Sequence, residues 1–167
     1  GQKILFYPTF LSPYKHIPYL LDALAQLNQT APGGYLLILT INQESLEYFP
    51  CKQAIFEKIK ALQLDERSLL LTGSLSRDAI DQVYTLADAL VFPSQAETLG
   101  MPLLEAMHRQ LPIVATDTEY AKEVCGKAAL YADANNPEQL AQCIIDLFSS
   151  AETQAKLKQS AVEQAKH

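Results

Sequence analysis

The stretch that decides the fold is DALVFPSQAETLGMPLLEAMHRQLPIVATD, residues 88–117. Its first apolar run, ALVF at 89–92, is compact and is stopped by a proline, which predicts a short buried strand. Gly100 marks the start of a helix that we expect to run to about Arg109, and PIVAT at 112–116 predicts a second buried strand. A strand, a polar turn, a helix and another strand form the unit of a parallel sheet covered by helices.

Two glutamates lie in this stretch, eight residues apart. Glu97 falls in the turn after the first strand, and Glu105 lies in the first helical turn or just beyond it. The carboxyl ends of parallel strands face the crevice where open α/β sheets bind ligands. A helix start adds unpaired backbone N–H groups and a positive dipole end, which suit phosphate oxygens. The pattern indicates a ligand with both hydroxyls and phosphates, although Glu105 alone could be a surface glutamate that favours the helix dipole.

The remaining chain alternates short apolar runs with segments of helical spacing. Strands are predicted at residues 3–7, 35–41, 68–73 and 128–132, and helices at 18–28, 51–63, 77–87, 119–124, 137–148 and 151–166. Ser76 is a suitable N-cap for the third of these helices. We therefore predict a single α/β domain over residues 1–167, with a Rossmann-like, doubly wound, parallel six-stranded sheet in the order 3-2-1-4-5-6.

Composition and charge exclude several classes of function. The 167 residues are 49% hydrophobic and 19% charged, with a net charge of −6, which offers no basic face for nucleic acid. Cys51, Cys125 and Cys143 lack C-x-x-C spacing, which favours reduced thiols in a cytoplasmic protein over a disulfide or a metal site. No cluster has metal-ligand spacing, so we expect no metal and no cofactor. The loop at 8–18 contains no glycine, which argues against a dinucleotide fingerprint and hence an NAD or FAD enzyme.

The central stretch resembles a known family. The pattern PS-x-x-E-T-x-G-M-P-x-x-E-A-M at 93–107, followed by PIVATD at 112–117, is similar to the E-x7-E signature of retaining GT-B glycosyltransferases of family 4. The resemblance covers nearly the whole chain and matches the C-terminal, donor-binding half of such an enzyme, so the N-terminal acceptor domain would be absent from this chain. It implies that Glu105 binds the ribose hydroxyls of a nucleoside-diphosphate sugar, and that Glu97 is a catalytic carboxylate against the transferred sugar.

The same resemblance implies that backbone groups contact the donor. The start of the helix would meet the diphosphate or the sugar, and the turn after the third strand, which is similar to a G-x-x-S loop, would meet the nucleobase. The residues concerned are Thr98, Leu99, Gly100, Met101, Gly73, Ser74 and Leu75. From the residue types alone, Gly73 would be a turn glycine and Ser76 a helix cap, and both roles can coexist with ligand binding.

The family usually carries an arginine and a lysine, five residues apart, in the loop after the first strand. Lys15 matches the lysine, which implies a catalytic cation that neutralises the leaving diphosphate. Phe10 stands where the arginine is expected, so half of the phosphate clamp is missing or comes from elsewhere, and His16 is a possible neighbour. The alternative from the residue type alone is that Lys15 is an ordinary solvated loop lysine.

We therefore expect a retaining glycosyltransferase that transfers a hexose from a nucleoside-diphosphate sugar to a glycan or lipid-linked acceptor in cell-surface polysaccharide or lipopolysaccharide synthesis. The isolated chain should bind a nucleotide sugar weakly and transfer nothing. The full-length protein would be cytoplasmic, with peripheral association at the inner face of the membrane. The alternatives are a GT-B-type sugar-nucleotide epimerase and a non-catalytic nucleotide-sugar-binding domain.

Overall fold

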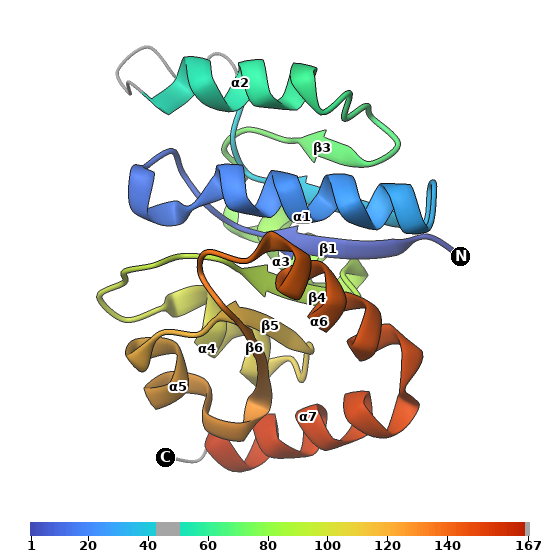
Figure 1. Cartoon of the computed structure of the whole chain (residues 1–167). Helices are drawn as coiled ribbons and strands as arrows, with labels where there is room; N and C mark the ends of the chain where they lie inside the picture. Colours follow the sequence, from blue (N-terminus) through green and yellow to red (C-terminus); the bar gives the residue numbers. More distant parts are fainter. Residues whose placement is uncertain (43–50, 166–167) are drawn as a thin grey trace.

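Six parallel strands form one sheet in the order β3-β2-β1-β4-β5-β6 (Figure 1), in a computed structural model that describes residues 1–42 and 51–165. The predicted α/β class and strand order are confirmed. The strands are β1 (Lys3–Tyr7), β2 (Tyr35–Leu39), β3 (Leu69–Leu71), β4 (Ala89–Phe92), β5 (Ile113–Thr116) and β6 (Ala129–Ala132). The order places β1 beside β4 although more than eighty residues separate them, with Leu5 opposite Ala89 and Phe6 opposite Leu90.

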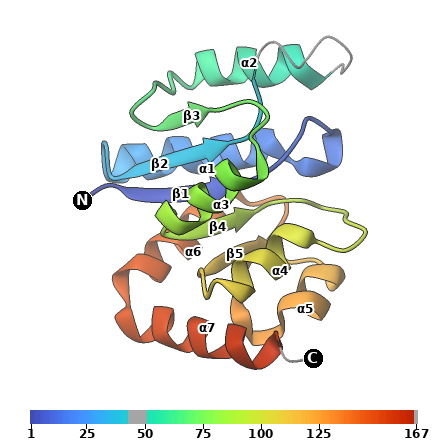
Figure 2. The ribbon, with the colours of Figure 1, turned by 180° about the vertical axis from the view of Figure 1, so that it is seen from behind.

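Helices cover both faces of the sheet, as the doubly wound prediction requires. They are α1 (Ile17–Thr30), α2 (Cys51–Ala61), α3 (Arg77–Leu86), α4 (Met101–His108), α5 (Glu119–Cys125), α6 (Pro137–Ser149) and α7 (Ala151–Gln164), with short 3-10 helices η1 (Pro13–Lys15) and η3 (Gly126–Ala128). Helices α1 and α6 pack together on one face, and α3 and α4 lie on the other (Figure 2). Every residue of β4 and β5 is buried in consequence.

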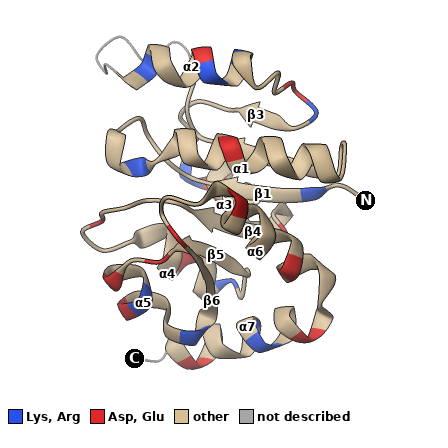
Figure 3. Ribbon diagram, in the orientation of Figure 1, with Lys and Arg blue, Asp and Glu red and all other residues tan. Residues whose placement is uncertain are grey.

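The core lies around the central strands. Phe6, Tyr7 and Phe92 are among the largest fully buried side chains. The rings of Tyr7 and Phe92 meet edge to face with centroids 5.5 Å apart, which is a favourable geometry for aromatic pairs. Acidic and basic side chains are interspersed along the outer helices α2, α5 and α7 (Figure 3). Within the described residues, no helix is long and apolar enough to cross a membrane.

Several predicted boundaries were wrong by one or two residues, and two of them have clear causes. The strand predicted at 35–41 ends at Leu39 because the Thr40 hydroxyl takes over the backbone pairing, donating to the Thr9 carbonyl and accepting from the Thr9 N–H at 2.7 Å each. The helix predicted at 51–63 ends at Ala61, and Gln63 just beyond it is left-handed with φ 54°. The strand predicted at 68–73 is shorter and covers only Leu69–Leu71. The last helix ends at Gln164, and Lys166 lies outside the described residues.

Candidate functional site

Two loops meet at the edge of the sheet formed by the carboxyl ends of the strands, called here the carboxyl edge. Lys15 lies after β1 and Glu97 lies after β4, and pairing of these strands brings the two side chains into an ion pair. The Lys15 side chain is 7% exposed and that of Glu97 is 14% exposed. The interpretation of Lys15 as a solvated loop lysine is therefore wrong. The prediction that both residues lie at the carboxyl edge agrees with the structure.

Backbone contacts hold Lys15 in place. Pro13 occupies the first turn of η1, and the N–H of Lys15 donates to the Ser12 carbonyl at 3.1 Å. The hydroxyl of Tyr7, from the end of β1, donates to the carbonyl of Lys15 at 3.1 Å. His16 follows in the left-handed region with φ 55° and redirects the chain into α1. The backbone of Lys15 is thus held close to the end of β1.

An aromatic pair covers the ammonium group. The Lys15 Nζ lies 4.7 Å from the centroid of the Phe10 ring and 5.4 Å from that of Tyr14, within the range of cation–π contacts. Phe10 is 53% exposed and Tyr14 is 41% exposed. Phe10, at the position where the family usually has arginine, therefore adds an apolar cover in place of a second charge. His16 instead stacks on Tyr19, with centroids 4.7 Å apart.

Ser94 and Tyr120 connect the Glu97 loop to its surroundings, and sequence reasoning missed both. The fully buried Ser94 donates from its Oγ to Glu97 Oε1 at 2.8 Å. Tyr120, on α5, donates from its hydroxyl to the Ser94 carbonyl at 2.6 Å. Burial raises the pKa of Tyr120 to about 12, so the phenol keeps its proton at neutral pH and remains a donor. The Glu97 carboxylate therefore has a defined orientation.

The start of α4 lies next to this pair in sequence and faces solvent. Gly100 is the N-cap with φ 59°, and a Cβ there would lie 3.1 Å from Leu103 Cδ1. The N–H of Leu103 donates back to the Gly100 carbonyl at 2.8 Å. Leu99 and Met101 have exposed side chains, and within the described residues no acceptor is found for their N–H groups. This segment can therefore offer backbone donors to an anionic ligand.

Glu105 projects from the next turn of α4 and has two partners from α3. Its Oε1 lies 3.1 Å from a guanidinium nitrogen of Arg77, and its Oε2 accepts from the Tyr84 hydroxyl at 2.9 Å. The Glu105 side chain is 16% exposed, so it is not an exposed surface glutamate. Sequence reasoning missed Arg77 and Tyr84, although their spacing of seven residues on one helix was a signal that both lie on the same face.

The turn after β3 positions Arg77. Gly73 has φ +69°, and a Cβ there would lie 2.5 Å from Asn42 Nδ2, so the position requires glycine on two grounds. Ser76 caps α3 as expected, because its side chain accepts from the Ala79 N–H at 3.2 Å. Ser74 is exposed and Leu75 is partly buried, so both remain open to a ligand. Among the described residues, no hydrogen bond or ion pair joins this turn directly to the Lys15–Glu97 pair, so the two halves of the predicted site are separate.

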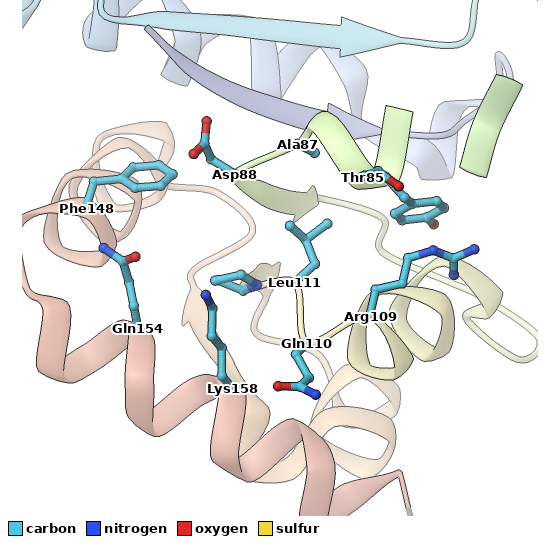
Figure 4. Close-up of a pocket in the computed structure, with 11 residues that line it drawn as sticks. Thr85, Ala87, Asp88, Arg109, Gln110, Leu111, Phe148, Gln154 and Lys158 are labelled. Carbon is cyan, nitrogen blue, oxygen red and sulfur yellow. The ribbon is translucent and has the colours of Figure 1, made fainter. Parts of the chain in front are cut away.

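A cavity of about 450 Å³ lies at the opposite edge of the sheet (Figure 4). Asp88 and Pro112, which immediately precede β4 and β5, line it together with Phe148, Gln154 and Lys158. None of the side chains predicted to bind the donor lines this cavity. Among the described residues, no group of three or more His, Cys, Asp or Glu side chains is placed to hold a metal ion.

A single parallel six-stranded sheet with helices on both faces defines a Rossmann-like α/β domain. The sequence profile described as Glycosyl transferases group 1 matches residues 1–164, and the chain belongs to this family. The fold is similar to the C-terminal domain of a glycosyl transferase group 1 protein, LpcC from Francisella tularensis. The TM-score is 0.78 and the identity 18%, over 99% of this chain and 84% of that one.

Longer relatives match as well. Anabaena HepE, solved in complex with UDP and glucose, has a TM-score of 0.81 and 25% identity over 98% of this chain and 43% of its own. The O-antigen chain mannosyltransferase B of Escherichia coli is 27% identical over 144 residues, which cover 86% of this chain and 36% of that protein. The serotype-specific mannosyltransferase WbdA of Escherichia coli is 28% identical over 102 residues, 61% of this chain and 12% of that protein. The chain thus spans less than half the length of each of these relatives.

Proposed function

We propose that this chain is the donor-binding domain of a retaining GT-B glycosyltransferase, which transfers a hexose from a nucleoside-diphosphate sugar to a glycan or lipid-linked acceptor. The observation that carries the proposal is the arrangement of Glu97 and Glu105 on either side of the α4 start at the carboxyl edge. One carboxylate faces the Lys15 ammonium and the other lies one helical turn into α4. The free N–H groups between them suit a diphosphate.

In this proposal Glu105 binds the ribose. A carboxylate accepts up to about four hydrogen bonds, and Arg77 and Tyr84 occupy one on each oxygen. Both oxygens therefore retain capacity for the two adjacent hydroxyls of a ribose. A hydrogen bond to a charged group contributes about 1.5–3 kcal/mol, so loss of Glu105 should weaken donor binding by about one to two orders of magnitude.

Lys15 and the α4 start would stabilise the leaving diphosphate. A lysine ammonium has three N–H donors, and the pairing with Glu97 uses one of them. Phosphate oxygens could reach the remaining donors after Phe10 and Tyr14 move aside, since both rings are exposed. Charge that develops on the departing oxygen would then be stabilised by fixed donors in a site from which water is excluded. Glu97, oriented by Ser94, would face the transferred sugar.

The acceptor site would lie outside this chain, because the chain corresponds to less than half of HepE and of the O-antigen mannosyltransferase. HepE was solved with UDP and glucose, and the Escherichia coli relative is an O-antigen chain mannosyltransferase, which supports a hexose donor and a role in cell-surface polysaccharide synthesis. Closure of a second domain over the carboxyl edge would complete the site and exclude water. Membrane association of the full-length protein and its cytoplasmic location belong to the same proposal.

A non-catalytic nucleotide-sugar-binding domain is the second candidate. The position of Phe10 favours it, because the ring takes the place of a second cation and covers the Lys15 ammonium. The two candidates share the donor site and differ in turnover. Joined to its acceptor domain, the catalytic form should lose turnover in Lys15→Met while still binding donor, whereas the non-catalytic form has no turnover to lose.

Isothermal titration of this chain with UDP-, GDP- and ADP-sugars tests the donor site directly. We expect weak, saturable binding of one donor class, and binding reduced at least tenfold in Glu105→Gln. The matched control is Glu123→Gln, a carboxylate exposed on α5. Absence of heat with all donors, or an unchanged affinity in Glu105→Gln, contradicts the binding role. Sugar transfer by this chain alone contradicts the assignment of the acceptor site to another domain.

A further inference from the structure

Tyr84 is a buried residue whose hydroxyl contacts the carboxylate of Glu105. It lies on α3, is 2% exposed, and places its hydroxyl 2.9 Å from Glu105 Oε2. The same hydroxyl lies 3.5 Å from the Pro102 carbonyl in the first turn of α4. A buried phenol that reaches a partly exposed carboxylate restricts where that carboxylate can point.

The Tyr84 ring is fixed from more than one direction. Phe6 of β1 meets it edge to face, with centroids 5.0 Å apart and an interplanar angle of 85°. The guanidinium of Arg109, at the end of α4, lies 4.7 Å from the ring centroid. Arg109 is itself held by Asp81 on α3, and its Nη1 donates to the Glu105 carbonyl at 3.1 Å. Arg109 therefore ties the Tyr84 ring to the backbone of the residue whose side chain Tyr84 contacts.

The two side-chain partners of Glu105 differ in strength. The Arg77 side chain is 70% exposed, so its ion pair with Glu105 is screened by solvent and contributes little orientation. The Tyr84 hydroxyl acts from a buried position, where a hydrogen bond is electrostatically stronger. Burial, followed by the negative charge of Glu105, raises the pKa of Tyr84 far above its usual value. The phenol therefore keeps its proton and donates throughout the neutral range.

From this geometry we infer that Tyr84 is the positioning residue that orients Glu105 toward the two hydroxyls of a nucleotide ribose. The inference rests on the proposed function and adds to it a residue that does not touch the ligand. Tyr84 occupies one lone-pair position of Oε2 and thereby restricts rotation of the carboxylate, which keeps one acceptor position on each oxygen for the ribose hydroxyls. Tyr84 thus makes selection for a ribose diol depend on the packing of α3 against α4.

The test compares the affinity for a nucleotide that has both ribose hydroxyls with the affinity for an analogue that lacks them. Among UDP, GDP and ADP, the diphosphate that binds wild-type chain most tightly is titrated beside its 2′,3′-dideoxy analogue. We expect Tyr84→Phe to weaken binding of the diphosphate about tenfold and that of the dideoxy analogue less than about twofold. The matched control is Tyr131→Phe, which removes a hydroxyl that donates to the Gly126 carbonyl at 2.7 Å; it should change neither affinity.

The outcomes separate the inference from the proposed function. Equal weakening of both ligands in Tyr84→Phe identifies a merely structural tyrosine and overturns the inference, as does an unchanged affinity for the diphosphate, while the donor site stands. If wild-type chain does not distinguish the diphosphate from its dideoxy analogue, or if Glu105→Gln keeps the distinction, the ribose role of Glu105 fails and the inference fails with it. In the Glu105→Gln background, Tyr84→Phe should have no further effect. If Tyr84→Phe does not fold, Arg109→Lys, which removes the flat guanidinium from the ring, must show the same selective loss.

Discussion

Lys15 and Glu97, 82 residues apart in the chain, form a nearly buried ion pair that joins the loops after β1 and β4. The pair spans the strands at the centre of the sheet and lies beside the start of α4. In the proposed enzyme it holds the cation that meets the diphosphate and the carboxylate that faces the sugar. It also has consequences for stability, because removing one partner leaves an unpaired charge in a water-poor site.

The free energy of unfolding should respond to this pair in a non-additive way. We expect Lys15→Met to lower it by about 3 kcal/mol because Glu97 then has no cation beside it. The double variant Lys15→Met/Glu97→Gln should recover part of that loss, since both charges are gone. Urea unfolding of the four proteins in the cycle measures the coupling. If the effects of the two single variants on the free energy of unfolding simply add up to that of the double variant, the ion pair is too well solvated to stabilise the fold.

Two glycines with nearly the same φ allow the cost of backbone strain to be measured separately from the cost of a steric clash. Gly73 has φ +69° with a side-chain nitrogen of Asn42 2.5 Å from a built Cβ, whereas Gly33 has φ +70° and no atom within 4 Å. Gly33→Ala should cost about 1 kcal/mol from backbone strain alone. We expect Gly73→Ala to cost more, because Asn42 must also move, and to weaken donor binding by displacing the turn. Chemical unfolding and nucleotide titration of both variants check this, and equal costs would show that Asn42 moves away freely.

Restoring the charge missing at Phe10 should strengthen donor binding. Phe10 is exposed and lies 4.7 Å from the Lys15 ammonium, so an arginine there brings a second cation to the diphosphate position. We expect Phe10→Arg to raise nucleoside-diphosphate affinity about tenfold at low salt, with a gain that shrinks as salt rises. Phe10→Leu is the control for loss of the aromatic cover. A gain of the same size in Phe10→Leu would attribute the effect to uncovering Lys15 and not to charge.

Stability should fall at alkaline pH through Cys125. Burial raises the pKa of this thiol from its usual value near 9 to about 12. A folded pKa above the unfolded one means that the stabilising contribution is complete below pH 9 and is lost as pH rises from about 9 to 12. Each pH unit in that window removes up to about 1.4 kcal/mol from the free energy of unfolding. Buried tyrosines with raised pKa values, such as Tyr7 and Tyr84, add to the same alkaline loss, so Cys125→Ala should reduce the slope between pH 9 and pH 10 without abolishing it, and an unchanged slope would contradict the assignment.

Topology explains how much of the site could be predicted from sequence. Short apolar runs and helical spacing predict six strands and their order, and that order alone places Lys15 and Glu97 at one edge. The directions of long side chains could not be predicted. Burial of Lys15 under Phe10 depends on how η1 folds, and the contact between Tyr84 and Glu105 depends on how α3 packs against α4. The hydrophobic periodicity of the sequence does not indicate loop conformations or helix–helix contacts of this kind.

Strand ends show the same limit on a smaller scale. β2 ends early because a threonine side chain from one loop replaces backbone pairing in another, which no local pattern indicates. The partners of Glu105 are likewise contributed by a helix that precedes it by about twenty residues. Residues whose role follows from their place on a strand end can be predicted, whereas residues that act through a second side chain cannot.

A crystal structure of this chain with the most tightly bound nucleoside diphosphate tests the central claim most directly. The account predicts the two ribose hydroxyls within about 3 Å of the Glu105 carboxylate oxygens, and the diphosphate against the N–H groups at the start of α4. A nucleotide bound at the opposite edge of the sheet, in the cavity beside Asp88 and Lys158, or a ribose turned away from Glu105, would contradict it.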